Sequence, residues 1–310
     1  MLVTELLKLS PDAGQREALL ETMRACNAAA DRAAEVAFAH RALGAVPYDP
    51  RILTFKGHDQ VSIATLGGRI LVPVLNQGRW SALDGTTRRG QTDLIYRDGQ
   101  FYLASVIEVP EPPAGAPPRD WLGVDLGIVN LATDSHGTAY SGRAVRAVRF
   151  RNRTLRARLQ RKGTKSAKRL LKKRRRAEAR FARNTNHVIS KRLVGKAKDT
   201  RTGIALEDLG GIRERVTVTK AQRADLHAWS FRQLRTFVTY KAALAGVHVR
   251  LVDPRNTSRT CPSCGHCAKR NRPHRDSFLC VACGFAGPAD HIAAINIGRR
   301  AVSHAADDAA

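Results

Sequence analysis

Acidic residues are scarce in this sequence: 27 Asp and Glu stand against 53 Lys and Arg in 310 residues, which gives a formal net charge of +26. Such a charge indicates a polyanionic partner, and nucleic acid is the commonest one. The sequence also lacks any run of about 18 apolar residues, and its N-terminus lacks a basic start followed by an apolar core. We therefore expect a soluble, intracellular protein that does not contact a membrane.

Cysteines are few, and four of the six form two Cys-x-x-Cys pairs: Cys261 with Cys264, and Cys280 with Cys283. In an intracellular chain this pattern indicates zinc rather than disulfides. A glycine follows the second cysteine of each pair, which allows a tight turn around the ion. The sequence predicts one structural Zn²⁺ in a zinc ribbon over residues 259–286.

The N-terminal third predicts a small β domain with a helical insertion. A short strand ends near Leu9, and Ser10-Pro11-Asp12 start a helix that is expected to run to about Leu43. Short β-rich segments follow, and Asp98-Gly99 is a strong signal for a hairpin turn. We expect a β-barrel or sheet over residues 1–115 with the helix at about 11–45. Five prolines between residues 110 and 118 mark a linker.

Apolar segments after this linker predict a mixed α/β domain over residues 119–258. Residues 121–133 are expected to form one strand, a turn at Gly137 is followed by β-like residues through Val148, and residues 202–206 and 247–252 add further strands. A helix is expected over residues 229–245, and another is expected to resume at residue 188.

Residues 149–183 carry seventeen Lys or Arg and a single acid, Glu178. We interpret them as two basic helices hinged near Gly163-Thr164, within a helical region of about 149–195. A solvated charged face is the simpler reading, but like charges repel, so phosphate contact is favoured. The residues predicted to bind nucleic acid are Arg156, Lys168, Arg169, Lys172, Lys173, Arg174, Arg175 and Arg176.

Three acids stand at the ends of apolar segments: Asp125, Glu207 and Asp290. Each has an ordinary interpretation, because Asp290 could cap a helix, Glu207 could lie on the surface and Asp125 could pair with an arginine. Together, three carboxylates in a basic chain provide what a pair of Mg²⁺ ions needs. The sequence therefore predicts a catalytic magnesium site formed by these three residues.

The motifs around these acids resemble a known family. Residues 123–127 (GVDLG), 207–209 (EDL) and 290–297 (DHIAAINI) are similar to the three RuvC motifs of the TnpB (OrfB) nucleases, relatives of the type V CRISPR effectors. Tyr240-Lys241, Val252-Asp253-Pro254 and Thr257-Ser258 before the first cysteine pair resemble the family's approach to its zinc ribbon.

The resemblance implies an RNase H-like (RuvC) nuclease core over residues 119–258 with the zinc ribbon inserted, a last helix and tail over 287–310, and a wedge domain over 1–115. It implies an RNA-guided DNA endonuclease of a bacterial transposable element that uses two Mg²⁺, binds a guide RNA and target DNA, takes no small-molecule substrate and works in the cytoplasm near the nucleoid. Asp208 is a second choice to Glu207 as ligand. The basic ribbon residues Lys269, Arg270, Arg272, His274 and Arg275 are expected to touch nucleic acid near the site.

Three alternatives remain open at this point. The chain could bind DNA under RNA guidance without cutting it, although all three acids are present. It could be an unguided nuclease, which would leave the zinc ribbon unexplained. It could also be a DNA-strand transferase, because one fold supports several chemistries.

Overall fold

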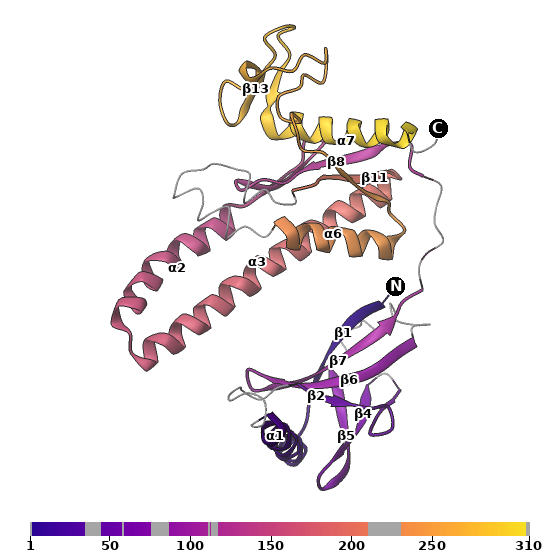
Figure 1. Ribbon diagram of the computed structural model, residues 1–310, viewed down its shortest axis with the longest axis vertical. Coiled ribbons are helices and arrows are strands. Elements are labelled where there is room, and N and C mark those ends of the chain that lie inside the picture. The colour runs from indigo at the N-terminus through magenta and orange to yellow at the C-terminus, as the bar shows by residue number, and fades with distance from the viewer. Residues whose placement is uncertain are drawn as a thin grey trace. The chain divides into compact units, whose positions relative to one another are not determined.

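The computed structural model describes residues 2–34, 45–57, 59–75, 87–110, 112, 117–209 and 231–307. The chain divides into two compact units, residues 1–111 and 112–310 (Figure 1). None of the described helices combines the length and the apolar character needed to cross a membrane.

The first unit is a seven-stranded antiparallel sheet in the order β2-β6-β7-β1-β5-β4-β3. The predicted hairpin at Asp98-Gly99 is confirmed, because both residues have positive φ (51° and 79°) between the paired residues Arg97 and Gln100. Its elements are β1 (Leu2–Leu9), α1 (Ala13–Ala34), β2 (Val46–Tyr48), β3 (Leu53–Lys56), β4 (Gln60–Thr65), β5 (Gly68–Leu75), β6 (Thr87–Arg97) and β7 (Gln100–Glu108).

Helix α1 begins with a capping box formed by Asp12 and Gln15. The Gln15 amide donates to Asp12 Oδ1 (2.8 Å), and the Asp12 amide donates to Gln15 Oε1 (3.0 Å). Leu19 and Met23 are fully buried against the sheet. The predicted continuation of the helix to Leu43 lies outside the described residues. Cys26, on α1, would be expected to pack in the core as a small apolar side chain, but it is exposed.

The second unit is built on a mixed five-stranded sheet in the order β10-β9-β8-β11-β12, in which β8, β11 and β12 are parallel and β9 and β10 are antiparallel. The mixed α/β class predicted from the sequence is confirmed. Its elements are β8 (Trp121–Asp125), β9 (Asn130–Asp134), β10 (Ala139–Ser141), α2 (Arg143–Lys162), α3 (Lys165–Thr200), β11 (Gly203–Glu207), α6 (Phe231–Ala245), β12 (Val249–Val252), the short 3-10 helix η2 (Lys269–Asn271), β13 (Ser277–Leu279), β14 (Ala286–Pro288) and α7 (Ala289–Asp307).

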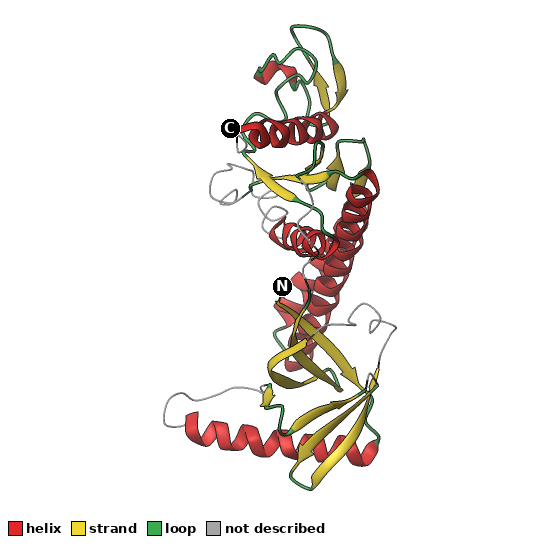
Figure 2. Cartoon of the chain, turned by 90° about the vertical axis from the view of Figure 1, so that its right-hand side faces the viewer, coloured by secondary structure: helices red, strands yellow, loops and turns green. Residues whose placement is uncertain are grey.

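Both faces of this sheet are covered, α7 on one and α3 with α6 on the other (Figures 1 and 2). Side chains alternate along each strand, so Leu122 and Val124 pack with residues of α3 and α6, whereas Trp121 packs with residues of α7. A side chain at an odd-numbered position of β8 or β11 therefore faces α7. This alternation decides which acids can meet.

Three predicted boundaries in this unit were wrong. The strand expected over 121–133 is two strands, because the chain turns back after Asp125 and β9 pairs antiparallel with β8. The β-like residues up to Val148 are helical from Arg143 onward. The helix expected to resume at Val188 belongs to α3, which runs without a break to Thr200 because its inner face continues through Ile189, Leu193 and Ala197.

The predicted hinge between the two basic helices is confirmed. Gly163 has φ 63°, which ends α2 in a left-handed conformation, and the Thr164 side chain accepts a hydrogen bond from the Ala167 amide (3.2 Å) to start α3. Figure 1 shows the two helices as an antiparallel hairpin whose tip points away from the sheet.

Candidate functional site

Two of the three acids lie at the carboxyl ends of adjacent parallel strands. In the ladder between β8 and β11, Leu206 pairs with Val124, so Glu207 and Asp125 occupy the next position in register on the two strands. Both face α7, as the alternation of side chains requires. Glu207 is only 7% exposed, so the alternative that it is a surface residue is wrong.

The third acid reaches the same place through α7. This helix begins at Ala289, so Asp290 lies inside its first turn and is not an N-cap. Asn130, at the start of β9, donates a hydrogen bond from Nδ2 to Asp290 Oδ2 (3.1 Å). The structure thus brings Asp125, Glu207 and Asp290 from two strands and one helix to one end of the sheet.

Two glycines set the distance between α7 and the sheet. A methyl group on Gly123 of β8 would collide with the Ala294 carbonyl oxygen, and one on Gly298 of α7 would lie 2.8 Å from the Trp121 carbonyl oxygen. The helix therefore packs directly on the backbone of the strand that carries Asp125. This close approach places the first turn of α7 beside the strand end.

The electrostatics of the cluster are those of crowded carboxylates. Burial raises the pKa of Asp125 well above its usual range, and the charges of Glu207 and Asp290 raise it further, while Arg272 acts in the opposite direction. Burial also raises the pKa of Glu207, against a hydrogen bond from Thr257 and the charge of Arg300 that lower it. Burial therefore disfavours the ionised forms of Asp125 and Glu207, and mutual repulsion adds to this at Asp125.

Glu207 is held by one neighbouring hydroxyl, since Thr257 Oγ1 donates to Glu207 Oε1 at 2.6 Å. Asp208, the second choice for a ligand in the sequence, points elsewhere. Its side chain is 55% exposed and accepts a hydrogen bond from Arg235 Nη1 (2.8 Å). Neighbouring positions on a strand face opposite sides, which explains the difference.

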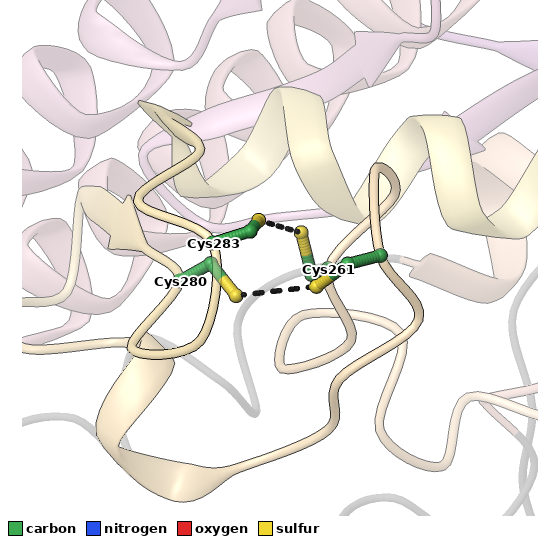
Figure 3. Close-up of side chains that lie close together, drawn as sticks. Cys261, Cys280 and Cys283 are labelled. Atoms are coloured by element: carbon green, nitrogen blue, oxygen red, sulfur yellow. Dashed lines mark hydrogen bonds between the residues drawn. The ribbon is translucent and has the colours of Figure 1, made fainter.

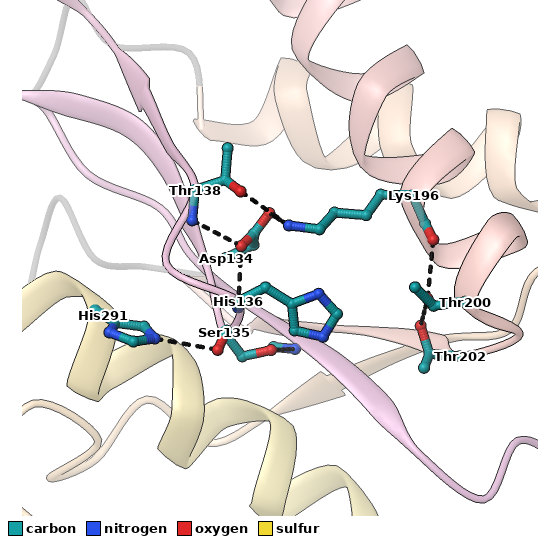
Figure 4. A network of polar contacts seen from close by, with 9 residues as sticks. Asp134, Ser135, His136, Thr138, Lys196, Thr200, Thr202 and His291 are labelled. Carbon is teal, nitrogen blue, oxygen red and sulfur yellow. Dashed lines mark hydrogen bonds and ion pairs between the residues drawn. The ribbon is translucent and has the colours of Figure 1, made fainter.

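Another acid close by, Asp134, is fully buried but belongs to a different network (Figure 4). It pairs with Val124, so its side chain lies on the face opposite Asp125. Lys196 Nζ donates to Asp134 Oδ2 (2.7 Å), and the amides of His136 and Thr138 donate to Oδ1 (3.0 Å each). These partners neutralise the carboxylate and tie the turn between β9 and β10 to α3.

The four paired cysteines converge on one point. Their sulfur atoms all lie within 4.8 Å of one another, with 3.6 Å between Cys261 and Cys283 and 3.6 Å between Cys264 and Cys280 (Figure 3). Such a group can hold a metal ion such as zinc, because four thiolates form a closed tetrahedral set. His266 and Cys267 lie close by in the sequence and carry possible ligand atoms, but they are not part of the group.

The two cysteine turns share one geometry. Gly265 and Gly284 both have φ 75°, and their amides donate to the carbonyl oxygens of Cys261 (3.0 Å) and Cys280 (2.9 Å). The predicted need for glycine is therefore confirmed. Asn271, fully buried, donates to the His266 carbonyl (3.0 Å) and accepts from the Val281 amide (3.0 Å), which ties the two turns together.

The eight residues predicted to bind nucleic acid all lie exposed on the α2–α3 hairpin. Arg156 is on α2, and the other seven are on the first part of α3. Glu178 crosslinks the hairpin: it accepts from Asn152 Nδ2 (2.9 Å) and Arg156 Nη2 (3.3 Å). The one acid of this segment therefore holds the two basic helices together against their repulsion.

Three polar residues near the acids were not predicted as site residues from the sequence: Thr133, Thr257 and Arg272. Thr133 pairs with Asp125 across β8 and β9, so its side chain lies on the same face. Its hydroxyl is buried without a hydrogen-bond partner among the described residues. Nothing in the sequence marks it out from other strand threonines. Thr257 and Arg272 stood out only as part of a motif and of a basic segment.

Two family models match the chain. The model described as "Probable transposase" (OrfB_IS605) matches residues 104–209, and the "Cas12f1-like, TNB domain" model matches residues 231–297. Their boundaries enclose the strands of Asp125 and Glu207 and the cysteine cluster.

Curated relatives also match part of the chain. The "CRISPR-associated endodeoxyribonuclease Cas12f1" of Sulfoacidibacillus thermotolerans is 37% identical over 120 residues, 38% of this chain and 27% of that protein. The "TnpB-like protein MJ0751" of Methanocaldococcus jannaschii is 35% identical over 115 residues, 37% of this chain and 41% of that protein. The matched region thus spans less than half the length of either relative.

Among solved structures, the cryo-EM structure of CasPhi-2 (Cas12j) bound to crRNA superposes with a TM-score of 0.50 at 13% identity, over 78% of this chain and 61% of that chain. This likeness concerns the fold alone. The chain therefore shares its fold with this Cas12 effector. The OrfB_IS605 model at residues 104–209, the Cas12f1-like TNB model at residues 231–297 and the TnpB-like relative confirm the resemblance of the motifs to the TnpB (OrfB) family.

Proposed function

We propose that this chain is an RNA-guided DNA endonuclease of a transposable element, with a RuvC-type, RNase H-like core that cleaves phosphodiester bonds with Mg²⁺. The observation that carries the proposal is the convergence of Asp125, Glu207 and Asp290 on one face of the sheet, beside α7. The names of the relatives, endodeoxyribonuclease and TnpB-like protein, support it.

The donor set fits Mg²⁺. Hard cations of this size take oxygen ligands, and the cluster offers three carboxylates. Burial and mutual repulsion raise the pKa of Asp125, so bound cations would stabilise its ionised carboxylate. The buried Thr133 hydroxyl, without a partner among the described residues, adds an oxygen on the same face. Two bound Mg²⁺ would activate a water for in-line attack and stabilise the leaving oxygen.

The chain's own residues would supply binding and orientation. Asp125, Glu207 and Asp290 would hold the cations from fixed backbone positions. Arg272, whose charge acts on Asp125, is half-buried, and its guanidinium donates to the Arg275 carbonyl (2.7 Å from Nη2). It would place a fixed positive charge from the ribbon next to the phosphate.

Nucleic acid would lie along the α2–α3 hairpin, where exposed Lys and Arg can contact phosphates in any sequence. The guide RNA and the target DNA are the proposed partners, and residues 1–115, which include the first unit, are the proposed wedge domain. The cysteine cluster would hold one Zn²⁺ and keep the ribbon folded.

The test begins with co-expression of the protein and its flanking genomic DNA, followed by sequencing of the RNA that copurifies. The complex is then given a DNA duplex that matches this RNA, in Mg²⁺, and both binding and cleavage are measured. We expect the parent to cut and Asp125→Ala, Glu207→Gln and Asp290→Asn to bind without cutting. Asp208→Asn is the matched control and should cut nearly as well as the parent.

The other functions are outcomes of the same experiment. A parent that binds matched DNA but never cuts it is an RNA-guided binding protein. Cutting that ignores the match between guide and DNA indicates an unguided nuclease, and joined products indicate a strand transferase. If Asp125→Ala cuts at the parental rate, the assignment of the acids is wrong.

A further inference from the structure

The loop between β12 and the first cysteine pair, residues 253–260, touches the metal-binding candidate Glu207 through one side chain. Thr257 is 3% exposed, and its Oγ1 lies 2.6 Å from Glu207 Oε1 and 3.1 Å from the Pro254 carbonyl oxygen. A hydroxyl has a single proton to donate. The distance of 2.6 Å is typical of an O–H donor to an ionised carboxylate. The Thr257 hydroxyl therefore donates to Glu207 rather than to the Pro254 carbonyl.

The loop is fixed to the same helix that carries Asp290. Asn296, itself buried, donates from Nδ2 to the carbonyl oxygens of Thr257 (2.7 Å) and Thr260 (2.8 Å). Further along α7, Arg300 donates to the Asp253 carbonyl (2.6 Å). The position of the Thr257 hydroxyl is therefore set by the backbone of its loop, and the loop by side chains of α7.

Glu207 depends on this contact for its orientation. A glutamate side chain has a terminal torsion with broad freedom, and Glu207 has no other side-chain hydrogen bond in the part of the chain that the structure describes. With Oε1 occupied by Thr257, the second carboxylate oxygen is left for a cation. Hydrogen-bond partners of metal-binding carboxylates commonly orient them in this way.

We infer that Thr257 is a positioning residue for the metal site: its hydroxyl orients the Glu207 carboxylate toward the cations that Asp125 and Asp290 share. The inference rests on the proposed function. It gives the loop of residues 253–260 a role at the metal site, in addition to connecting β12 to the zinc ribbon. It also links the ribbon to the site, because Thr257 and Cys261 are four positions apart on one short loop.

The test measures Mn²⁺ binding to the full-length protein, loaded with zinc and its copurified RNA, by the loss of the free-ion signal in electron paramagnetic resonance. Asp125→Ala gives the background that belongs to RNA and to other sites. Thr257→Val keeps the size of the side chain and removes the hydroxyl, and Thr257→Ser keeps the hydroxyl. Thr260→Val is the control, because the Thr260 hydroxyl faces the Asn256 carbonyl in the same loop (3.0 Å).

We expect Thr257→Val to weaken Mn²⁺ binding about tenfold, as for other hydrogen-bond partners of metal ligands. Thr257→Ser should restore the affinity, and Thr260→Val should bind like the parent. Equal losses in Thr257→Val and Thr257→Ser, or a parental affinity in Thr257→Val while Asp125→Ala loses the site, would overturn the inference and leave the proposed function standing. If the parent and Asp125→Ala bind Mn²⁺ equally, the metal site itself is wrong, and the inference fails with it.

Discussion

Gly123 of β8 and Gly298 of α7 meet backbone to backbone: a methyl group on Gly298 would lie 3.2 Å from the Gly123 amide nitrogen. Contacts this close leave no space for a side chain on either residue. The pair sets how near α7 comes to the sheet, and thereby how near Asp290 comes to Asp125. The geometry of the proposed metal site thus depends on two residues that have no side chain.

Gly298→Ala should therefore both destabilise the protein and impair the site. We expect a loss of about 1–3 kcal/mol in the free energy of unfolding, since the helix must move off the strand, and slower cleavage because Asp290 moves with it. Gly195→Ala in α3, where a methyl group meets nothing within 4 Å, is the control and should stabilise by about 0.5–1 kcal/mol. Denaturant unfolding of both variants compares them, and equal stability of the two would contradict the packing argument.

The raised pKa of Asp125 predicts a pH-dependent loss of stability in metal-free protein. The folded state holds the Asp125 proton to higher pH than the unfolded state does, so stability falls as pH rises from about 4 up to the folded pKa. Asp125→Asn removes this loss, so its melting temperature should exceed the parent's by a margin that grows across this window and then levels off. Added Mg²⁺ should narrow the margin by stabilising the parent. A difference in melting temperature that does not change with pH would contradict the raised pKa of Asp125.

The cysteine cluster predicts one zinc per chain. Cys261→Ser and Cys283→Ser should yield poorly soluble protein, because the binding free energy of a structural zinc is folding free energy. Cys267→Ser, outside the cluster, is the matched control and should keep both zinc and solubility. The measurement is metal analysis of the purified proteins. A folded and soluble parent protein that contains no zinc would contradict the predicted zinc site.

The exposed arginines of the α2–α3 hairpin should contribute to nucleic-acid binding irrespective of base sequence. Replacing Arg174, Arg175 and Arg176 with alanine should weaken binding and flatten its salt dependence by about 0.9 in log–log slope for each lost phosphate contact on duplex DNA. A single Lys198→Ala, near the other end of α3, should change the slope less than a single Arg174→Ala. Binding measured over a range of salt concentrations gives these slopes. An unchanged slope in the triple variant would show that these three arginines do not contact phosphates.

Local chemistry made several features predictable from the sequence. Asp98-Gly99 specified its hairpin because both turn residues tolerate positive φ, and Gly163-Thr164 specified the hinge because glycine ends one helix and threonine caps the next. The fixed spacing of the cysteine pairs is likewise a local property, and the structure brings all four sulfurs together.

Boundaries were less predictable where tertiary packing competed with local pattern. Residues 121–133 are mostly apolar and were therefore predicted to form one strand. The reversal between β8 and β9 follows from the antiparallel pairing of these two strands, while β8 pairs with β11 on its other side. Helix α3 crosses the expected gap before Val188 because its inner residues pack on the sheet over its later turns.

The sequence by itself determined the strong positive charge, the residue types of the site and the local turns, because these depend on composition and on neighbours along the chain. The tertiary structure decided which of the acids meet. Strand register and side-chain alternation put Asp125 and Glu207 on one face and turned Asp134 and Asp208 away from it. The close packing of α7 on β8 then added Asp290, and the loop held by Asn296 brought the Thr257 hydroxyl to Glu207, since contacts across long stretches of chain exist only once the core is packed.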